Sequence, residues 1–225
     1  MKGQEADLTW TPQGVPISRR FEDPYFSMAD GLSETRHVFL RGNGLPKRFA
    51  NAAPHHVAEL GFGTGLTLAV MRAAHRDAGL TPRFRFTSFE AFPMPVPAMR
   101  EALAHFSEIA AEIDDVLDVL ASGGTRWSAP DLDFELIRGD ARKTLPDWPG
   151  TAQSWCLDGF SPAKNPELWD PALLQAVADH TAPGGRFATY TAAGHVRRAL
   201  AAAGFEVSRV PGFGRKRHMS VGRLR

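Results

Sequence analysis

The fold of this chain is decided by the stretch Val57-Ala58-Glu59-Leu60-Gly61-Phe62-Gly63-Thr64-Gly65-Leu66. It opens as a short apolar run, passes through an acid and then carries three glycines spaced two apart. Leu68, Ala69 and Met71 continue from Leu66 at helical spacing, so the stretch predicts a strand, a tight turn and a helix. Glycines suit such a turn because its backbone angles exclude most side chains and because a ligand must approach the main chain closely. The stretch therefore predicts a nucleotide-binding α/β fold.

The spacing of these glycines narrows the choice of ligand. Dinucleotide enzymes favour G-x-G-x-x-G, in which helix amides face a pyrophosphate, whereas this turn reads E-x-G-x-G-x-G. A carboxylate at Glu59 would repel a pyrophosphate but can hold an ammonium, which suits the methionine part of S-adenosylmethionine. The motif alone leaves two alternatives open, a dinucleotide and a glycine turn without a ligand.

Length and composition predict one globular α/β domain. The chain has 225 residues, 43% of them hydrophobic, which is enough for one well-cored domain and too few for two of ordinary size. No apolar run reaches the length of a signal-peptide core or a membrane span. The single Cys156 excludes an internal disulfide and a Cys-rich zinc site, and the histidines lack ligand spacing, so no metal is expected. We expect a soluble cytoplasmic protein that does not contact membranes.

The formal net charge of +1 hides a strong asymmetry. Ten acids lie between Glu101 and Asp140, whereas the chain from Ser208 onward has six Lys or Arg residues and no acid. Another acid-free stretch, from Arg36 to Ala58, carries four Lys or Arg residues. Two basic stretches that meet on one face would attract a polyanion such as RNA. The alternative is two ordinary solvated faces, and charge alone does not decide between them.

Residues 1–50 do not follow an α/β repeat, and we expect them to form an arm that packs over the ligand cleft. Leu8 to Ile17, interrupted by Pro12-Gln13-Gly14, predicts a small hairpin. Gly31 to Leu40 predicts a short helix with Asp30 as its N-cap. Residues 51–225 are then expected to form the α/β domain.

Five strand–helix units and a terminal hairpin are predicted in residues 51–225. The parallel strands are expected at 56–60, 84–89, 134–138, 154–157 and 186–191, and the antiparallel pair at 205–210 and 218–224. Helices are expected at 64–78, 98–106, 108–120, 171–180 and 194–203. This is a Rossmann-like seven-stranded sheet with an antiparallel last strand, the class I S-adenosylmethionine-dependent methyltransferase variant of the doubly wound fold, with a small N-terminal extension.

Four of the five parallel strands end in or just before an acid, namely Glu59, Glu90, Asp140 and Asp158. Ligands of open parallel sheets bind beyond the carboxyl ends of the strands, so these carboxylates are expected around one cleft. Glu90 is placed to accept both ribose hydroxyls, and Asp140 to meet the adenine amine, with the amide of Ala141 facing the ring. For Glu90 and Asp140 the alternative is a solvated acid that caps the next helix.

Asp158 opens the most unusual segment, Asp158-Gly159-Phe160-Ser161-Pro162-Ala163-Lys164-Asn165-Pro166-Glu167-Leu168-Trp169. An acid at the end of this strand stands next to the transferring methyl group, where it can accept a proton from a substrate amine or orient it. Phe160 can stack on a flat substrate and Lys164 can contact phosphate. Pro162 and Asn165 of the same turn are further candidate substrate-binding residues. The alternative is a rigid Pro-rich loop supported by Trp169.

A second group of candidate substrate-binding residues lies in the basic turn between the last two strands. Phe213, between two glycines, can stack on a base, and Arg215, Lys216 and Arg217 can contact phosphate. An exposed turn aromatic is the alternative for Phe213.

With these residues in view, the chain resembles the methyltransferase part of the MnmC family of bacterial tRNA wobble-uridine modification proteins, which also occurs alone as MnmD. The resemblance runs almost from end to end. Its most specific part is the segment from Asp158 to Trp169. The other matching segments are Asp23–Ser27, Asp30–Thr35, Val38–Asn43, Glu59–Leu66, Thr189–Gly194 and Gly212–Arg217.

The resemblance implies transfer of a methyl group from S-adenosylmethionine to 5-aminomethyl-2-thiouridine in a tRNA anticodon. It assigns Asp158 to the substrate amine. The donor site would comprise Glu59, Gly61, Phe62, Gly63, Gly65, Glu90, Asp140 and Ala141. Two-part members of the family continue into a flavin-dependent oxidase that exposes the amine, whereas this sequence stops at Arg225, so a separate oxidase is an expected partner.

Two other functions stay open at this stage. One is a methyltransferase for a small-molecule amine, whose turnover salt would hardly affect. The other is a noncatalytic tRNA-binding protein, which would keep its biological activity after Asp158→Ala.

Overall fold

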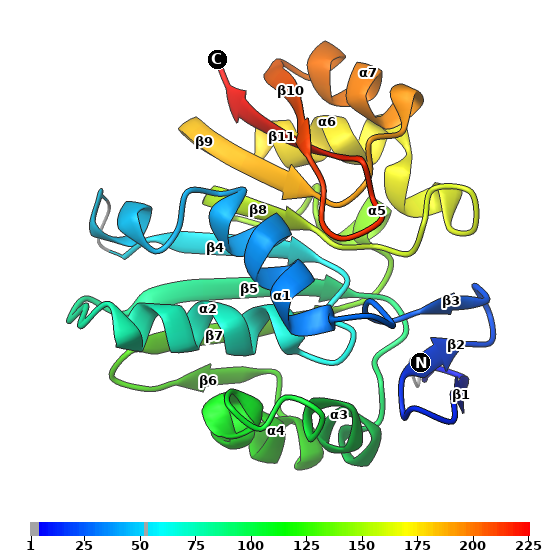
Figure 1. The fold of residues 1–225 in the computed structure, drawn as a ribbon. Coiled ribbons are helices and arrows are strands. Elements are labelled where there is room, and N and C mark those ends of the chain that lie inside the picture. Colours follow the sequence, from blue (N-terminus) through cyan, green and yellow to red (C-terminus); the bar gives the residue numbers. More distant parts are fainter. Residues whose placement is uncertain (1–4, 52–53) are drawn as a thin grey trace.

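The structure is a computed structural model that describes residues 5–51 and 54–225. Among these residues, eight strands form one sheet in the order β10-β11-β9-β8-β4-β5-β7-β6 (Figure 1). Neighbouring strands from β9 to β7 run parallel, while β11 and β6 run antiparallel to their neighbours. The strands are β4 (His56–Leu60), β5 (Phe84–Glu90), β6 (Arg126–Ser128), β7 (Leu132–Arg138), β8 (Ala152–Leu157), β9 (Thr181–Thr189), β10 (Phe205–Pro211) and β11 (His218–Leu224).

All seven predicted strands are present, and the structure adds β6 at the edge of the sheet. This strand has only three residues, too few to show an alternating pattern, and it is recognised by its pairing, with Trp127 opposite Phe134. Strand β9 also begins five residues before the prediction, because the Pro183-Gly184-Gly185 turn signal lies inside it as an irregularity in its pairing with β8.

Two layers of helices cover the sheet. The helices are α2 (Leu66–Asp77), α3 (Val96–Leu103), α4 (Asp114–Ala121), α5 (Ala141–Thr144), α6 (Pro171–Asp179) and α7 (Gly194–Ala202). The 3-10 helices are η2 (Lys47–Asn51), η3 (Ala110–Ile113) and η4 (Pro166–Trp169). The single helix expected over 108–120 is therefore divided into η3 and α4.

Successive residues of a strand pack against opposite helix layers. Val57 packs in the cluster with α2, α3 and α4, while its neighbour Ala58 packs with α5, α6 and α7. Phe86 and Phe89 of β5 divide in the same way. A strand buried on both faces, such as β4, reads as a short apolar run, whereas β5 and β7 are visible in the sequence because their large apolar residues alternate with polar ones.

The N-terminal segment has two parts. Strands β1 (Leu8–Trp10), β2 (Pro16–Ser18) and β3 (Asp23–Pro24) form a small antiparallel sheet, which confirms the predicted hairpin. This small sheet lies beside the carboxyl ends of the parallel strands (Figure 1). The second part is α1 (Gly31–Thr35), capped by Asp30 as predicted, and a π-helix, η1 (Arg36–Arg41).

This second part packs on the main sheet. Val38 and Phe39 belong to the core, and the buried Asn43 donates to the carbonyl oxygens of Phe39 and Trp155. The expected division of the chain at residue 50 stays a prediction. Within the described residues, no helix combines the length and apolar character that crossing a membrane requires.

Candidate active site

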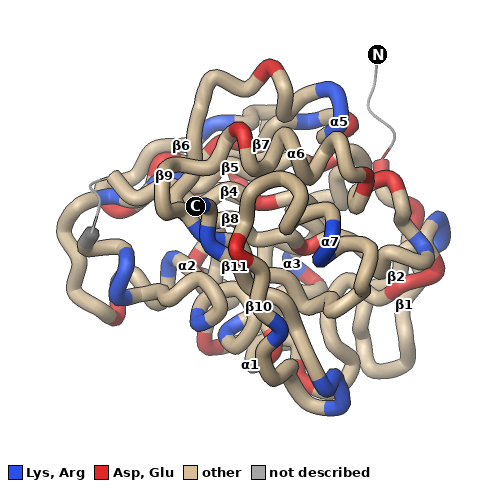
Figure 2. Tube along the Cα trace, turned by 90° about the horizontal axis from the view of Figure 1, so that it is seen from above, with Lys and Arg blue, Asp and Glu red and all other residues tan. Residues whose placement is uncertain are grey.

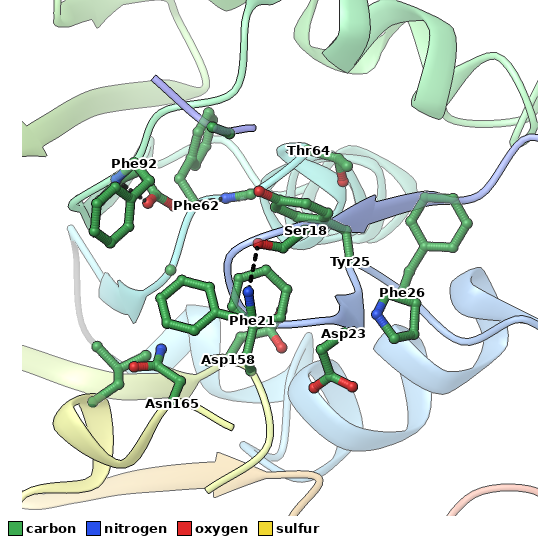
Figure 3. A pocket seen from close by; sticks show the side chains of 18 of the residues that line it. Ser18, Phe21, Asp23, Tyr25, Phe26, Phe62, Thr64, Phe92, Asp158 and Asn165 are labelled. Carbon is green, nitrogen blue, oxygen red and sulfur yellow. Dashed lines mark hydrogen bonds between the residues drawn. The ribbon is translucent and has the colours of Figure 1, made fainter. Parts of the chain in front are cut away.

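A cavity of about 680 Å³ lies between the carboxyl ends of the parallel strands and the N-terminal segment (Figure 3). Its wall includes ten of the residues that the sequence singled out, and these come from the glycine turn, from the ends of β5, β7 and β8, and from the β10–β11 turn. They are Gly61, Phe62, Gly63, Glu90, Asp140, Ala141, Asp158, Phe160, Asn165 and Lys216. Residues that lie far apart in the sequence therefore meet at one site.

Asp158 lies at the end of β8, where its amide donates to the carbonyl oxygen of Leu60 at 3.1 Å and continues the pairing with β4. The Thr67 hydroxyl donates to its Oδ2 at 3.4 Å. Burial, and secondarily the negative charge of Glu34, raises the pKa of Asp158 to about 7, although the positive charge of Lys216 acts in the opposite direction. A carboxylate with this pKa can take up or release a proton near neutral pH.

Glu90 is held rigidly against the glycine turn. Its Oε2 accepts from the amide of Gly63 at 3.1 Å and its Oε1 from the amide of Phe92 at 2.8 Å. Burial raises the pKa of Glu90, and these backbone amides oppose the rise. Each carboxylate oxygen has a further lone pair, so Glu90 can still accept two hydroxyl groups of a ligand.

Glu59 lies behind the wall and does not line the cavity. Its side chain is buried, its Oε2 accepts from the Ser88 hydroxyl at 2.7 Å, and its Oε1 has no partner. Burial, followed by the charge of Asp158, raises the pKa of Glu59 well above its ordinary value. Direct contact between Glu59 and a ligand stays a prediction.

Gly61 is the tightest point of the turn. Its φ is +91°, and a Cβ atom built there would lie 2.4 Å from the carbonyl oxygen of Asp158. A side chain at this position would therefore push the end of β8 away. Gly65, with φ +83°, precedes α2 and does not line the cavity.

Asp140 has two tasks in the structure. It caps α5 by accepting from the amide of Arg142 at 3.0 Å, as the capping alternative predicted, and both of its carboxylate oxygens accept from the Arg142 side chain. Asp140 and Ala141 also lie on the cavity wall. An approach to Asp140 by an adenine amine would share the carboxylate with Arg142.

The segment after Asp158 carries a stack of aromatic rings. Phe160 stacks on Phe21 with 4.9 Å between ring centroids, and Tyr25 meets its edge at 5.0 Å. Figure 3 shows Phe21 and Tyr25 near Asp158. Trp169 donates to the Phe160 carbonyl oxygen at 2.8 Å, so Trp169 supports the loop as the alternative interpretation predicted. The same loop also lines the cavity.

Pro162 and Lys164 do not line the cavity. The Lys164 ammonium binds the Glu22 carbonyl oxygen and lies 3.3 Å from Asp23 Oδ1, while Asp23 Oδ2 accepts from the amide of Ser161. Lys164 therefore fastens the N-terminal segment to the loop. Its predicted contact with phosphate would require this pairing to open.

The basic turn between β10 and β11 divides in two. Lys216 reaches the cavity wall, whereas Phe213, Arg215 and Arg217 do not line it. Phe213 is half-buried, with its ring 6.0 Å from that of His37. Arg215 and Arg217 are exposed, and neither has an ion-pair partner in the described part of the chain.

The sequence patterns single out only part of the wall. Among the side chains that they miss are Phe21, Asp23, Tyr25, Glu34 and Tyr190. The last four belong to segments quoted for the family resemblance, so a signal was available. No local pattern in the sequence indicates that these segments lie at the carboxyl ends of the parallel strands.

Two further observations limit the chemistry of the site. The residues that the structure describes contain no group of three or more His, Cys, Asp or Glu placed to hold a metal ion. Cys156 is buried and unpaired in β8, and burial raises the pKa of its thiol well above the ordinary value. Neither feature offers a metal centre or a reactive thiolate.

Known proteins resemble the chain over its whole length. Two relatives share the name "tRNA 5-methylaminomethyl-2-thiouridine biosynthesis bifunctional protein MnmC". The one from Stutzerimonas stutzeri is 42% identical over 98% of this chain and 35% of that protein, and the one from Caulobacter sp. is 45% identical over 93% and 37%. The chain thus spans about a third of the length of these relatives.

Solved structures agree with the fold. MnmC2 from Aquifex aeolicus has a TM-score of 0.77 at 25% identity, covering 100% of this chain and 72% of that chain. Spermidine synthase from Thermotoga maritima has a TM-score of 0.61 at 13% identity, covering 100% and 70%, which is a likeness of fold alone.

A family model described as "S-adenosyl-L-methionine-dependent methyltransferase" matches residues 108–225, just over half of the chain. The matched residues include Asp140, Asp158 and the basic turn. The glycine turn and Glu90 precede them and line the same cavity. The chain therefore belongs to the S-adenosyl-L-methionine-dependent methyltransferases.

Proposed function

We propose that this protein methylates the primary amine of 5-aminomethyl-2-thiouridine at the wobble position of tRNA, giving 5-methylaminomethyl-2-thiouridine. The observation that carries the proposal is Asp158, a carboxylate with a pKa of about 7 on the wall of the cavity beside the glycine turn. The relatives named for this modification support the choice of substrate. This chain covers only about a third of the length of these relatives. We therefore propose their activity for this chain rather than assign it.

The residues around the cavity fit the cofactor of the family. Glu90 offers free lone pairs at the end of β5, the typical position for ribose hydroxyls in this fold. Gly61 and Gly63 leave the main chain open beside it, and the wall is negatively charged at Glu90 and Asp158, which suits a cation. When bound, S-adenosylmethionine supplies a methyl group on a positively charged sulfur, and that sulfur keeps the electron pair of the broken C–S bond.

Asp158 is proposed as the catalytic residue because a primary amine is mostly protonated at neutral pH. The substrate ammonium first gives a proton to the ionised Asp158, which frees the nitrogen lone pair. The nitrogen then forms its bond to the methyl carbon, and the product leaves as a methylated ammonium. The half-buried position of Asp158 next to Phe160 favours the neutral amine over the charged form.

The surroundings of Asp158 suit a nucleobase and its backbone. Phe160 and Phe21 offer aromatic faces on which a base can stack. The tip of the β10–β11 hairpin carries Arg215, Lys216 and Arg217. Figure 2 draws all Lys and Arg positions of the chain trace in blue. Phosphates next to the wobble nucleotide could pair with the exposed Arg215 and Arg217, which flank the cavity-lining Lys216 in the sequence.

The direct test is nucleoside mass spectrometry after incubation with methyl-labelled donor. Transfer RNA with 5-aminomethyl-2-thiouridine should gain one labelled methyl group at that nucleoside, and the same tRNA with plain 2-thiouridine should gain none. A labelled free amine with unlabelled tRNA would favour the small-molecule alternative. Binding of tRNA without any methyl transfer would favour the noncatalytic alternative.

Two further proposals follow from the substrate. A primary amine at this position has to be supplied by an earlier reaction, and we propose an oxidase that removes a carboxymethyl group from the same nitrogen. We also propose a cytoplasmic location, because tRNA carries out its work there.

We expect Gly61→Ala to lower cofactor affinity at least about tenfold. The new Cβ would meet the Asp158 carbonyl oxygen, and the positive φ adds strain of about 1–3 kcal/mol, so the turn and the end of β8 must move together. Calorimetric titration with S-adenosylhomocysteine measures the change. Gly79→Ala is the matched control, since Gly79 also has a positive φ of +64° but has no atom within 4 Å of the added Cβ. Equal affinity of both variants would contradict the account of the turn.

We expect Arg215→Ala with Arg217→Ala to weaken tRNA binding and to reduce the slope of log K against log salt by about 2, one unit per lost phosphate contact. Fluorescence anisotropy with labelled tRNA between low and moderate salt gives this slope. Arg83→Ala with Arg126→Ala removes the same charge from residues that pair with Asp133 and Glu135 of β7, towards the opposite edge of the sheet. A slope that changes equally in both double variants would show a general charge effect rather than a tRNA surface.

A further inference from the structure

Lys216 differs from its basic neighbours in the β10–β11 turn. Its ammonium lies 2.8 Å from Glu34 Oε1 and 4.2 Å from the centre of the Tyr190 ring. Arg215 and Arg217 have no acidic partner among the described residues, whereas the Lys216 side chain, although 47% exposed, reaches the cavity wall and pairs with Glu34. The sequence predicted a phosphate contact for this lysine, so its pairing with Glu34 needs another explanation.

The two groups that hold Lys216 form a site of the type that recognises ammonium ions. A carboxylate supplies the opposite charge, and an aromatic face attracts a cation through its quadrupole. Both groups are fixed in place. The Glu34 side chain is only 12% exposed in the first turn of α1, and the Tyr190 hydroxyl donates to the Gly159 carbonyl oxygen at 2.7 Å.

This ammonium site lies on the same cavity wall as Asp158, the proposed catalytic carboxylate. Glu34, Tyr190 and Lys216 line the same cavity as Asp158, and Gly159, which anchors Tyr190, is the residue after Asp158. The charges of Glu34 and Lys216 both act on Asp158. An ammonium that replaced Lys216 at this site would therefore lie in the same cavity as Asp158, where its charge would act on the carboxylate.

We propose that Glu34 and Tyr190 bind the cationic amine of the substrate beside Asp158, and that Lys216 occupies this site while no substrate is present. This inference rests on the proposed function and assigns amine binding and proton transfer to different residues. Glu34 and Tyr190 are positioning residues that hold the ammonium, and Asp158 takes its proton. The amine of the modified uridine and the Lys216 ammonium belong to the same chemical class, so the two compete for one site.

The test measures how much the amine contributes to binding. Two anticodon stem-loop RNAs that differ only in the wobble nucleoside, 5-aminomethyl-2-thiouridine or 2-thiouridine, are titrated in the presence of S-adenosylhomocysteine, which prevents turnover. The ratio of their dissociation constants reports the amine alone, because contacts with phosphates and with the rest of the RNA cancel.

We expect Glu34→Gln to reduce this ratio at least tenfold. Glu108→Gln is the matched control, because it removes the same charge from an acid that pairs with Arg36 outside the cavity wall, and it should leave the ratio unchanged. Tyr190→Phe keeps the aromatic face and should keep most of the ratio, whereas Tyr190→Leu should lower it. Thermal unfolding of each variant verifies that it is folded.

Lys216→Met separates the proposal from the phosphate contact predicted by the sequence. Removal of a competitor should tighten binding of the amine-bearing RNA and leave the control RNA unchanged. Equal weakening of both RNAs would overturn the role given to Lys216, and an unchanged ratio in Glu34→Gln would overturn the amine site. Methyl transfer by the unaltered protein is scored separately, so failure of the proposed function can be told apart from failure of this inference.

Discussion

Replacement of Asp158 by Asn should reduce methyl transfer to tRNA about 10³-fold while the RNA still binds, because general-base catalysis contributes about 10²–10⁴-fold. Asparagine has nearly the shape of aspartate and can accept a hydrogen bond from the amine, but it cannot take up a proton. Single-turnover transfer of labelled methyl groups gives the rate, and anisotropy gives the affinity. Asp179→Asn, at an exposed carboxylate that ends α6, should leave both quantities unchanged.

The pH dependence of the unaltered protein provides a second test of the same residue. Since Asp158 must be ionised to accept a proton and its pKa is about 7, kcat/KM should fall about tenfold per pH unit below pH 7. In Asp158→Asn the break near pH 7 should disappear, and the residual rate should keep rising above pH 7 as the substrate amine loses its proton. A variant that retains both the rate and the break near pH 7 would remove Asp158 from the chemistry.

Replacement of Arg72 by Met should destabilise the protein by about 3 kcal/mol or more, because removal of one partner of a buried ion pair leaves the other charge unpaired. The Arg72 side chain is 2% exposed. Its Nη1 and Nη2 donate to the two Asp115 oxygens at 2.6 and 2.9 Å, and its Nε and Nη2 donate to the two Asp131 oxygens at 2.9 and 3.0 Å. Burial alone would raise the pKa of Asp131, yet its bonds to Arg72 and Arg76 hold the pKa below its ordinary value.

The measurement is urea unfolding followed by circular dichroism, compared with Arg100→Met. Arg100 also binds two acids, Asp114 and Asp118, but it is exposed, and surface pairs contribute about 0–1 kcal/mol. Similar losses in the two variants would show that burial of Arg72 adds nothing. A loss confined to Arg72→Met would show that the Asp115 and Asp131 carboxylates stabilise the fold through this buried guanidinium.

The parallel part of the fold was predictable because its signals are local. A buried strand such as β4 is an apolar run, and the glycines after Leu60 report a turn that other residues cannot make. The convergence of Glu90, Asp140 and Asp158 followed from a property of every open parallel sheet, whose ligands bind at the carboxyl ends of the strands. Strand β6 was not predicted because a strand of three residues is too short to show a periodic pattern.

The rest of the cavity depends on contacts across the chain that no local pattern reports. Lys164 was an isolated cation in the sequence, and only the folded chain places Asp23 beside it. Lys216 looked like one of three equivalent basic residues, whereas Glu34, which lies 182 positions earlier in the sequence, draws it inward. Glu59 stood at the right place in the motif, but its exposure to the cavity depends on how the turn packs over it.

A crystal structure of the protein with S-adenosylhomocysteine tests most directly whether the strand-end carboxylates form the donor site. We expect the ligand to fill the cavity between the strand ends and the N-terminal segment, with its ribose hydroxyls on Glu90 and its sulfur facing Asp158. A ligand bound elsewhere, or a cavity that stays closed to it at saturating concentration, would show that these carboxylates do not form the donor site.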